Sequence, residues 1–452
     1  MTGMGIWAYS SRFYSKDPIK PFFFVEILLS LLWGLSVLFL KTYFIWSDFN
    51  IITFYIIFTM LTLFIWAFVW FEIPLVHEIL KKLKIKKEYA VSDIFTFDFA
   101  WALIASIAFP LFLLTELWLY YTAIFTGFIN LAVSVAFIFE MEKYNQKMKK
   151  YLVFSGFVMV VFIFAILAKP TSESYFYQKF YKEPVIYQKH SGYSDIVLTK
   201  WWEDFRMYID WNLQFMSLDE GIYHESLVNY PLKVIEKDES LRVLLLGWWD
   251  WLAVRNLLDS DRVWEIILVD LDSEITRLAR ENRLLVELNN NSLNNEKVKI
   301  INKDAFSYLL KEERNKYDFI IADFPDPRNA SLSKLYSKEF YTLAYNSLKK
   351  DWVFVTQSSN AFFADKAMKS AELSIKSVFG NSSPYHRYLP SFWDWGFIMA
   401  KKWWKIEKEF CTKWFCEVFE NWYNNLENIK ENTLVEPHII EYYIEWYNKY
   451  TL

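Results

Sequence analysis

The chain has 452 residues, a formal net charge of −4 and a hydrophobic fraction of 54%. Its length indicates two or three domains. Its slightly negative net charge gives no electrostatic attraction to the phosphates of a nucleic acid, so no nucleic-acid partner is expected. The apolar excess lies almost entirely before residue 170, and the remainder has the composition of an ordinary globular protein.

Five long apolar runs occupy the first part of the chain. They cover residues 21–41, 51–71, 98–116, 118–139 and 151–168. Each is close to the roughly 17–25 residues that a helix needs to cross a bilayer. Buried helices of a soluble domain are the alternative, which five such runs in so short a stretch disfavour. We therefore predict a multi-pass α-helical membrane domain over residues 1–170, with the lipid bilayer as partner and the cell membrane as location.

Two lysine clusters, at residues 81–87 and 143–150, follow the second and fourth runs. Such clusters mark loops on the cytoplasmic side of a membrane. If all five runs cross, the rest of the chain lies on the opposite side; if one does not, it lies in the cytoplasm. The sequence leaves the side of the membrane open.

Short alternating stretches with β character follow over residues 171–235. They are Val185–Tyr187, Ile196–Leu198, Arg206–Ile209 and Leu213–Phe215. This pattern predicts a small antiparallel β domain.

Buried-type strands then alternate with helical stretches over residues 236–401. The strands are Leu241–Leu246, Ile266–Asp270, Val298–Ile301, Phe319–Asp323, Val353–Gln357 and a final Gly396–Ala400, and the helical stretches include 273–287 and 336–349. The alternation predicts an α/β domain with a doubly wound, Rossmann-like parallel sheet of the methyltransferase type. Residues 402–452 are predicted to form a helical C-terminal tail, without a recognisable chemical motif.

Carboxylates lie at or just after the carboxyl end of each of the first four strands of this domain. They are Asp250, Asp270, Asp304 and the pair Asp323 and Asp326. Open α/β sheets bind ligands at the carboxyl ends of their strands, and an acid after the second strand can accept hydrogen bonds from both ribose hydroxyls. One loop carboxylate alone is usually just solvated. Four at successive strand ends predict a nucleoside site.

The order of these motifs resembles the spermidine synthase family. The matching segments are Gly-x-x-Asp at 247–250, Val-Asp-Leu-Asp at 269–272, Asp-Ala-Phe at 304–306 and Asp-Phe-Pro-Asp-Pro at 323–327. Residues 213–225, which include Gln214, Tyr223 and His224, and the downstream segments 332–341 and 390–392 also fit. The likeness spans about residues 180–400 and is closest to a bacterial subgroup with several N-terminal transmembrane helices.

The resemblance implies a polyamine aminopropyltransferase. Such an enzyme moves the aminopropyl group of decarboxylated S-adenosylmethionine to a diamine, as from putrescine to spermidine. Decarboxylated S-adenosylmethionine is then a co-substrate, no further cofactor and no metal is expected, and a homo-oligomer is compatible with the family.

The same resemblance implies roles for single residues. Asp323 would orient the attacking amine and accept its proton, as the catalytic residue, and Asp326 would support the amine pocket. Asp270 would hold the ribose and Asp304 the adenine, with Phe306 against the ring.

Further substrate-binding residues follow from the family pattern. Asp250 would lie near the aminopropyl amine and sulfonium. Gln214, Tyr223 and His224 belong to the segment that would line the donor or amine channel.

Two positions depart from the family pattern. Ser194 stands where many members have glutamine, and Phe392 stands where many soluble members have tyrosine in the amine pocket. The acceptor amine is therefore left open.

Two other functions fit part of the sequence. An S-adenosylmethionine-dependent methyltransferase would suit the sheet and its acidic positions, although segments 213–225 and 323–327 argue against it. A membrane transporter or sensor with an inactive nucleoside-binding domain would suit the apolar runs.

Tryptophan fills the loop in which the family has glycine. Gly247 is followed by Trp248, Trp249 and Trp251, although a backbone that approaches a nucleoside closely needs glycine. We expect these three indoles to occupy the space of the ligand. Tryptophan also stands at predicted turns, namely at Trp202, Trp211, Trp352 and Trp393.

Composition points the same way, because the chain has only 10 glycines but 22 tryptophans, whereas glycine is usually about 7% of residues. Our hypothesis is that the source organism reads UGA as glycine where this translation has tryptophan. The alternative is a genuine tryptophan-rich loop in a catalytically inactive domain.

Overall fold

The computed structural model describes residues 17–83, 90–235, 239–247, 251–402, 423 and 426–450. The chain divides into two compact units, Met1–Val185 and Ile186–Leu452.

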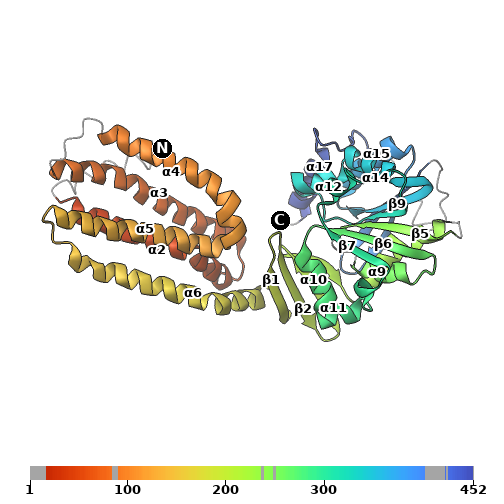
Figure 1. Ribbon diagram of the computed structural model, residues 1–452, viewed down its shortest axis with the longest axis horizontal. Helices are drawn as coiled ribbons and strands as arrows, with labels where there is room; N and C mark the ends of the chain where they lie inside the picture. The colour runs from red at the N-terminus through yellow and green to blue at the C-terminus, as the bar shows by residue number, and fades with distance from the viewer. Residues whose placement is uncertain are drawn as a thin grey trace. The chain divides into compact units, whose positions relative to one another are not determined.

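The first unit is a bundle of long helices (Figure 1). Its elements are α2 (Ile19–Trp46), α3 (Ile51–Lys82), α4 (Ala90–Ala108), the π-helical η2 (Phe109–Leu117), α5 (Trp118–Lys143), the short η3 (Lys149–Tyr151) and α6 (Leu152–Phe180). The ring of Phe162 lies against Gly34 and Gly127, where added Cβ atoms would lie 2.5 Å and 2.7 Å from it. Small residues at this point therefore let α2, α5 and α6 pack closely.

The bundle corrects two expectations. Four of the five apolar runs lie in helices long and apolar enough to cross a membrane, among the described residues. The run 98–116 is instead divided between α4 and η2, where Pro110 stands near the start of the π-helical turn and cannot donate an α-helical hydrogen bond. The predicted boundary at residue 170 is too early, because α6 continues through Pro170 to Phe180 after its apolar run has ended.

The second unit begins with the predicted antiparallel β domain. Strands β1 (Val185–His190), β2 (Asp195–Trp201), β3 (Asp204–Ile209) and β4 (Asn212–Met216) form one sheet in sequence order. Alternate side chains such as Ile196, Leu198 and Met207 are buried in the core. The turn between β3 and β4 has only two residues, Asp210 and Trp211.

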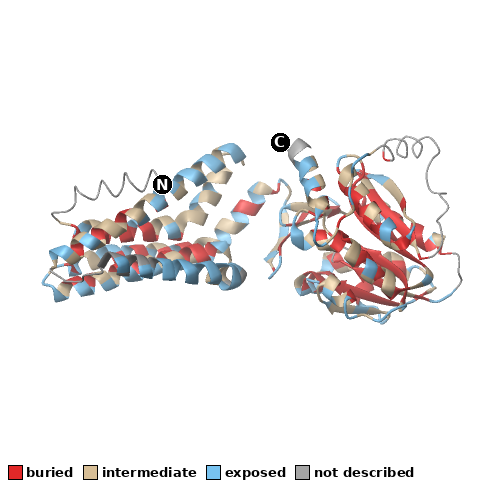
Figure 2. Cartoon of the chain, turned by 90° about the horizontal axis from the view of Figure 1, so that it is seen from above, coloured by how far each residue is buried: buried red, intermediate tan, exposed pale blue. Residues whose placement is uncertain are grey.

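A seven-stranded sheet forms the core of the same unit, with strand order β10-β11-β9-β8-β5-β6-β7. The strands are β5 (Leu241–Leu246), β6 (Val263–Asp270), β7 (Val298–Asn302), β8 (Tyr317–Ala322), β9 (Leu348–Asn360), β10 (Ser383–Leu389) and β11 (Trp393–Lys401). Strands β5 to β9 pair in parallel, whereas β10 and β11 pair antiparallel. Figure 2 shows that these strands are mostly buried. The Rossmann-like sheet is confirmed, but it is mixed instead of wholly parallel, because β11 and the unpredicted strand β10 run antiparallel.

Helices precede, connect and follow these strands (Figure 1). They are α7 (Glu220–His224), η4 (Glu225–Asn229), α8 (Tyr230–Val234), α9 (Trp251–Leu258), α10 (Ser273–Glu281), α11 (Arg283–Leu288), η5 (Ser292–Asn294), α12 (Ala305–Leu309), α13 (Ala330–Ser333), η6 (Lys334–Tyr336), α14 (Lys338–Ser347), α15 (Asp365–Phe379) and α17 (His438–Tyr450). The predicted helix 273–287 is two helices, because Asn282 ends α10 and its side chain caps α11. In the predicted tail, α17 is helical, whereas the described segment 426–437 is not.

The direction in which the sheet is built changes between β5 and β8. The chain passes from β5 outward to β6 and β7, and then returns to add β8 and β9 on the other side of β5. Doubly wound sheets bind ligands at this point, outside the carboxyl ends of the two strands. Gly247 follows β5 here and Asp323 follows β8, and the Asp323 N–H donates to the carbonyl of Leu246 at 2.8 Å.

Candidate active site

Two neighbouring cavities open at the carboxyl ends of β5 and β8. The larger cavity has a volume of about 560 Å³ and the smaller cavity about 450 Å³. Four residues line both, namely Gln214, Phe324, Pro325 and Arg328. The two cavities therefore adjoin each other at these residues.

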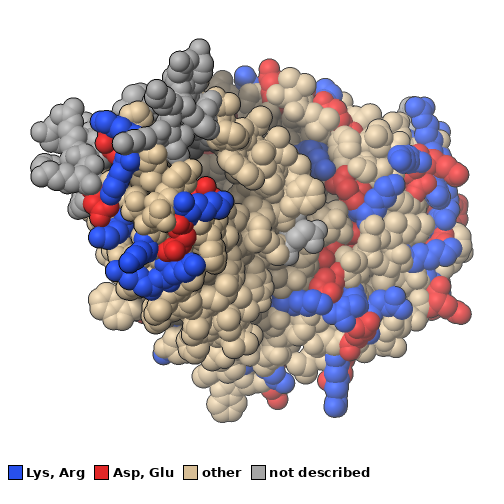
Figure 3. All heavy atoms as spheres, turned by 60° about the vertical axis from the view of Figure 1, so that its left-hand side comes forward, with Lys and Arg blue, Asp and Glu red and all other residues tan. Residues whose placement is uncertain are grey.

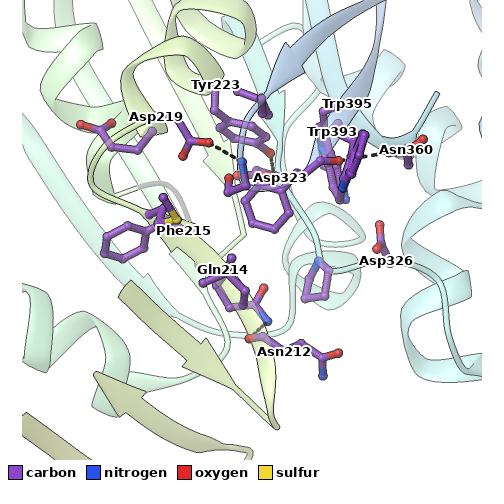
Figure 4. A pocket seen from close by; sticks show the side chains of 18 of the residues that line it. Asn212, Gln214, Phe215, Asp219, Tyr223, Asp323, Asp326, Asn360, Trp393 and Trp395 are labelled. Carbon is purple, nitrogen blue, oxygen red and sulfur yellow. Dashed lines mark hydrogen bonds between the residues drawn. The ribbon is translucent and has the colours of Figure 1, made fainter. Parts of the chain in front are cut away.

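The larger cavity combines carboxylates with aromatic rings (Figure 4). Its lining includes Asp219, Tyr223, His224, Asp323, Asp326, Asn360, Phe363, Phe392, Trp393, Trp395, Tyr443 and Trp446. An acidic site with aromatic walls suits an organic cation, because carboxylates attract its charge and ring faces attract it as well.

Asp323 and Tyr223 form a close polar pair in this lining. The Tyr223 hydroxyl donates to Asp323 Oδ1 at 2.5 Å, as Figure 4 shows. Asp323 is buried, with 2% of its surface exposed. The strand end of β8 and the first turn of α7 thus hold a carboxylate in one orientation at the cavity wall.

Glu220 holds the His224 side chain in the lining of the larger cavity. The His224 Nδ1 lies 2.9 Å from Glu220 Oε2, and Arg255 contacts the same carboxylate at 2.9 Å. Burial pushes the pKa of Glu220 upward, but His224 and Arg255 outweigh it and lower the pKa to about 2. Glu220 is therefore a structural anion that fixes the His224 ring in the lining.

Asp326 presents its carboxylate to the larger cavity and accepts from the Tyr443 hydroxyl at 3.0 Å. Burial raises its pKa, while the positive charge of Arg328 and the Tyr443 hydrogen bond oppose that rise. The ionised form of Asp326 thus depends on both neighbours.

The smaller cavity lies where the nucleoside site is predicted. Its lining includes Tyr193, Gly247, Val269, Leu271, Asp272, Asp304, Ala305, Leu332 and Leu335. Leucine side chains and the backbone of Gly247 give it an apolar floor suited to a ring. Gly247 has a φ of +124°, and a Cβ there would lie 1.8 Å from the carbonyl oxygen of Asp323.

Asp272, rather than Asp270, lines the smaller cavity. Asp270 is buried at the end of β6, where its Oδ1 accepts from the N–H of Asp272 at 2.7 Å, and burial raises its pKa well above the usual value. The Asp272 carboxylate caps α10 and accepts from the hydroxyls of Ser191 and Ser194. Ser194, one of the two departures from the family pattern, thus supports the carboxylate that faces the cavity.

Asp304 lies in the wall of the smaller cavity, as expected, but its oxygens already have partners. It caps α12 through Ser307 and contacts Lys334 Nζ at 2.8 Å. Burial would raise its pKa, but Lys334 and Ser307 outweigh this and lower it. Phe306 does not line the cavity; it packs with the core near Phe340.

Only part of the tryptophan-rich loop is described. Trp248, Trp249 and Asp250 lie outside the described residues. Trp251 is buried at the start of α9 and packs edge-on against Phe215, with ring centroids 5.3 Å apart. The expectation that its indole fills the nucleoside space is therefore wrong, because the first turn of α9 directs it into the core.

The structure adds residues that the sequence did not single out. Arg328 lines both cavities, and Asp219 and Tyr443 line the larger one. Arg328 stands only two positions after Asp326, so its proximity could have been anticipated. Tyr443 lies more than a hundred residues away and carries no local signal. The second departure, Phe392, does line the larger cavity.

Known proteins resemble the chain over its full length. A family model described as the spermine/spermidine synthase domain matches residues 220–409. The polyamine aminopropyltransferase of Oceanobacillus iheyensis is 31% identical, with 100% of this chain and 90% of that protein covered. That of Leptospira interrogans is 34% identical, with 88% of this chain and 78% of that protein covered.

Solved structures resemble part of the chain as well. The crystal structure of spermidine synthase from Thermotoga maritima is 23% identical, covers 56% of this chain and 82% of that chain, and gives a TM-score of 0.45. The full-length relatives carry the assignment: the chain belongs to the spermine/spermidine synthase family and is a polyamine aminopropyltransferase.

Proposed function

We propose that the enzyme transfers the aminopropyl group of decarboxylated S-adenosylmethionine to putrescine, which gives spermidine. The observation that carries the proposal is the pair of cavities with a shared wall that adjoins Asp323. One cavity has the apolar floor and polar rim that suit a nucleoside, and the other has the acidic, aromatic lining that suits a diamine.

In this proposal the donor lies in the smaller cavity. Asp272, with Asp270 behind it, lies closest to the ribose, and Asp304 lies near the adenine. Gln214 belongs to both cavities, so it lies beside the sulfonium and the reacting carbon. Asp250 remains a proposed contact of the aminopropyl amine, from its place in the sequence motif.

The amine binds in the larger cavity and attacks the donor where the two cavities adjoin. Asp323, oriented by Tyr223, accepts a proton from the ammonium, because only a neutral nitrogen has a free electron pair. The nitrogen then forms a bond to the aminopropyl carbon while the carbon–sulfur bond breaks. The bonding electrons return to sulfur, which leaves neutral 5′-methylthioadenosine. Holding the two reactants in line supplies a further large share of the acceleration.

An assay with two donors tests this function against methyl transfer. Purified full-length protein with decarboxylated S-adenosylmethionine and putrescine should form 5′-methylthioadenosine and spermidine in equal amounts, measured by chromatography. With S-adenosylmethionine in its place, formation of S-adenosylhomocysteine and a methylated amine would contradict the proposal. Donor binding without turnover of any diamine would favour a sensor.

The pH dependence should report on Asp326, which we propose must be ionised to bind an ammonium group. Its pKa is raised by burial and lowered by Arg328, so kcat/KM for the diamine should fall as the pH drops through that raised pKa. In Arg328→Met the lowering influence is lost, and the acidic limb should move to higher pH. An acidic limb that stays in place or moves to lower pH would contradict this role.

We also propose that the first unit spans a membrane. In the most apolar 18-residue window of α3, only 6% of the residues are buried, and large side chains such as Leu63, Phe64 and Trp66 are exposed. A continuous apolar surface of this kind is expected only against lipid or another protein. This supports a multi-pass protein of the cell membrane.

The charges of the bundle support the same proposal. Lysines gather where α2 and α6 begin and α3 and α5 end, and Lys82 there pairs with Asp17 at 2.9 Å. Figure 3 shows blue spheres grouped at one end of the bundle beside a broad surface without charged residues. By the positive-inside tendency this end faces the cytoplasm.

Cell fractionation tests the membrane proposal. The full-length protein should sediment with membranes and should be released by a mild detergent but not by high salt or alkaline carbonate. Release by salt alone would contradict a membrane span and would indicate binding at the surface.

A further inference from the structure

The C-terminal helix α17 is anchored to the catalytic unit, although it lies beyond residue 409, where the family match ends. Asn432, which is fully buried, donates from its side chain to the carbonyl of Ser333 at 2.9 Å and from its backbone to Ser374 Oγ at 2.7 Å. Glu445 on the helix pairs with Lys366 of α15 at 2.7 Å. These contacts fix the segment before α17 and the helix itself.

One side chain of α17 reaches into the larger cavity and contacts an acidic residue. Tyr443 has 5% of its surface exposed, lines the cavity and donates its hydroxyl to Asp326 Oδ2 at 3.0 Å. Burial raises the pKa of Tyr443, so the phenol stays protonated and remains a donor over the whole range of an assay. Trp446, one turn further along, lines the same cavity.

The contact has two consequences for Asp326. A hydrogen bond from a buried donor holds the carboxylate in one orientation, and it favours the ionised form against the effect of burial. An ionised, oriented carboxylate is what the second ammonium group of a diamine requires, because the first one lies at Asp323 and is deprotonated.

We propose that Tyr443 is a positioning residue for the acceptor amine, and that α17 closes one side of the larger cavity and limits the length of the diamine. The inference rests on the proposed function. Tyr443 acts through Asp326, and its helix supplies part of the specificity from outside the family domain.

Conservative replacement of Tyr443 tests the positioning role. In Tyr443→Phe, loss of one hydrogen bond to a charged group should raise KM for putrescine about 10-fold, with kcat within about twofold. The acidic limb of kcat/KM should also move to higher pH. Tyr447→Phe is the matched control, because Tyr447 lies on the same helix and is exposed. An unchanged KM and pH profile in Tyr443→Phe would overturn the inference.

A series of diamines tests the limit on length and separates the two proposals. In Tyr443→Ala the ratio of kcat/KM for 1,5-diaminopentane to that for putrescine should rise, because the cavity is longer. An unchanged ratio in a folded, active variant would overturn the role of α17. If the wild-type protein turns over no diamine at all, the proposed function fails independently of Tyr443.

A second inference comes from the backbone and concerns tryptophan. Four tryptophans adopt left-handed backbone conformations: Trp118 (φ 57°), Trp202 (φ 57°), Trp211 (φ 72°) and Trp393 (φ 62°). A bulky residue rarely adopts this region, because its Cβ is too close to the backbone. Among the described residues only one phenylalanine does so, although the chain has 42 phenylalanines and 22 tryptophans.

The turn between β3 and β4 is the sharpest case. Asp210 has a φ of 46° and Trp211 a φ of 72°, and these two residues alone connect the strands. A two-residue hairpin with positive φ at both positions is a type I′ turn, for which Asp-Gly is a preferred sequence. Trp211 therefore occupies the position that glycine normally fills.

We infer that these four positions are glycine in the protein that the source cell makes, and that their codon is UGA. The chain has 10 glycines, which is about 2% against a usual value of about 7%, as this exchange predicts. Trp248, Trp249 and Trp251 are assigned to the same set by the sequence motif alone, in which the family has glycine. Trp393 lines the larger cavity, so glycine there would also enlarge the amine site.

The codons of the gene decide this inference. UGA at positions 118, 202, 211 and 393 supports it, and peptide masses from the native protein should then correspond to glycine. UGG at these positions would overturn it.

Stability gives a second measurement on the protein itself. Trp202→Gly, in the full-length chain, should raise the melting temperature by about 2–4 °C, because the left-handed conformation is no longer strained. Trp201→Gly is the matched control, since Trp201 lies next to it in β2 without a positive φ, and it should lower the melting temperature. A decrease for both variants would contradict the inference.

Discussion

Replacement of Asp323 with asparagine should lower kcat by about 10²–10⁴-fold, the usual contribution of a positioned general base. The amide cannot accept the proton of the attacking ammonium, whereas its shape and its contact with Tyr223 are nearly retained. The measurement is the rate of 5′-methylthioadenosine formation at saturating concentrations of both substrates. Binding of the donor, measured by calorimetry, should change little.

A matched control separates catalysis from general damage. Asp261→Asn makes the same chemical change at an exposed residue before β6, at the opposite end of the strands, and should leave kcat unaltered. A loss of less than tenfold in Asp323→Asn would show that another group accepts the proton.

Replacement of Gly247 with alanine should destabilise the second unit by about 3 kcal/mol or more and should abolish activity. The added Cβ would lie 1.8 Å from the Asp323 carbonyl oxygen, and the residue would retain a φ of +124°. The backbones of Gly247 and Asp323 lie at the ends of the neighbouring strands β5 and β8. Neither backbone can move to relieve the contact without separating these two strands. The shift that relieves the contact would also displace Asp323 from Tyr223.

Chemical denaturation of the full-length protein measures this effect. Gly192→Ala is the control, because nothing lies within 4 Å of a Cβ at that position and its φ is not left-handed. Equal stability of the two variants would contradict the close approach of the strands, and an active Gly247→Ala enzyme would show that Asp323 does not depend on it.

The sheet and its acidic edge could be predicted from the sequence because both depend on local patterns. Strand β5 has the predicted bounds, and Asp323 and Asp326 follow β8 as expected. An apolar run such as Val243–Leu246 between turn residues is typical of a strand buried on both faces, and the residue after such a strand lies at the edge of the sheet.

The parts that could not be predicted depend on contacts between distant residues. The choice between Asp270 and Asp272 is made by hydrogen bonds from Ser191 and Ser194, which come from the loop before β2. The role of Tyr443 depends on where the chain runs after β11. The hydrophobic periodicity of the sequence does not predict that path. The end of α6 at Phe180 also escaped prediction, because its last turns are polar and aromatic instead of apolar.

In the proposed arrangement, the residues that line both cavities would couple the binding of the two substrates energetically. Phe324, Pro325 and Arg328 line both cavities, so a ligand that orders this segment from one side leaves less conformational freedom for the other ligand to remove. Such a coupling is reciprocal: the factor by which the nucleoside tightens amine binding equals the factor by which the amine tightens nucleoside binding. The product 5′-methylthioadenosine would then raise the affinity of the enzyme for the next diamine. Enzyme with both bound would accumulate as a dead-end complex whenever 5′-methylthioadenosine is not removed.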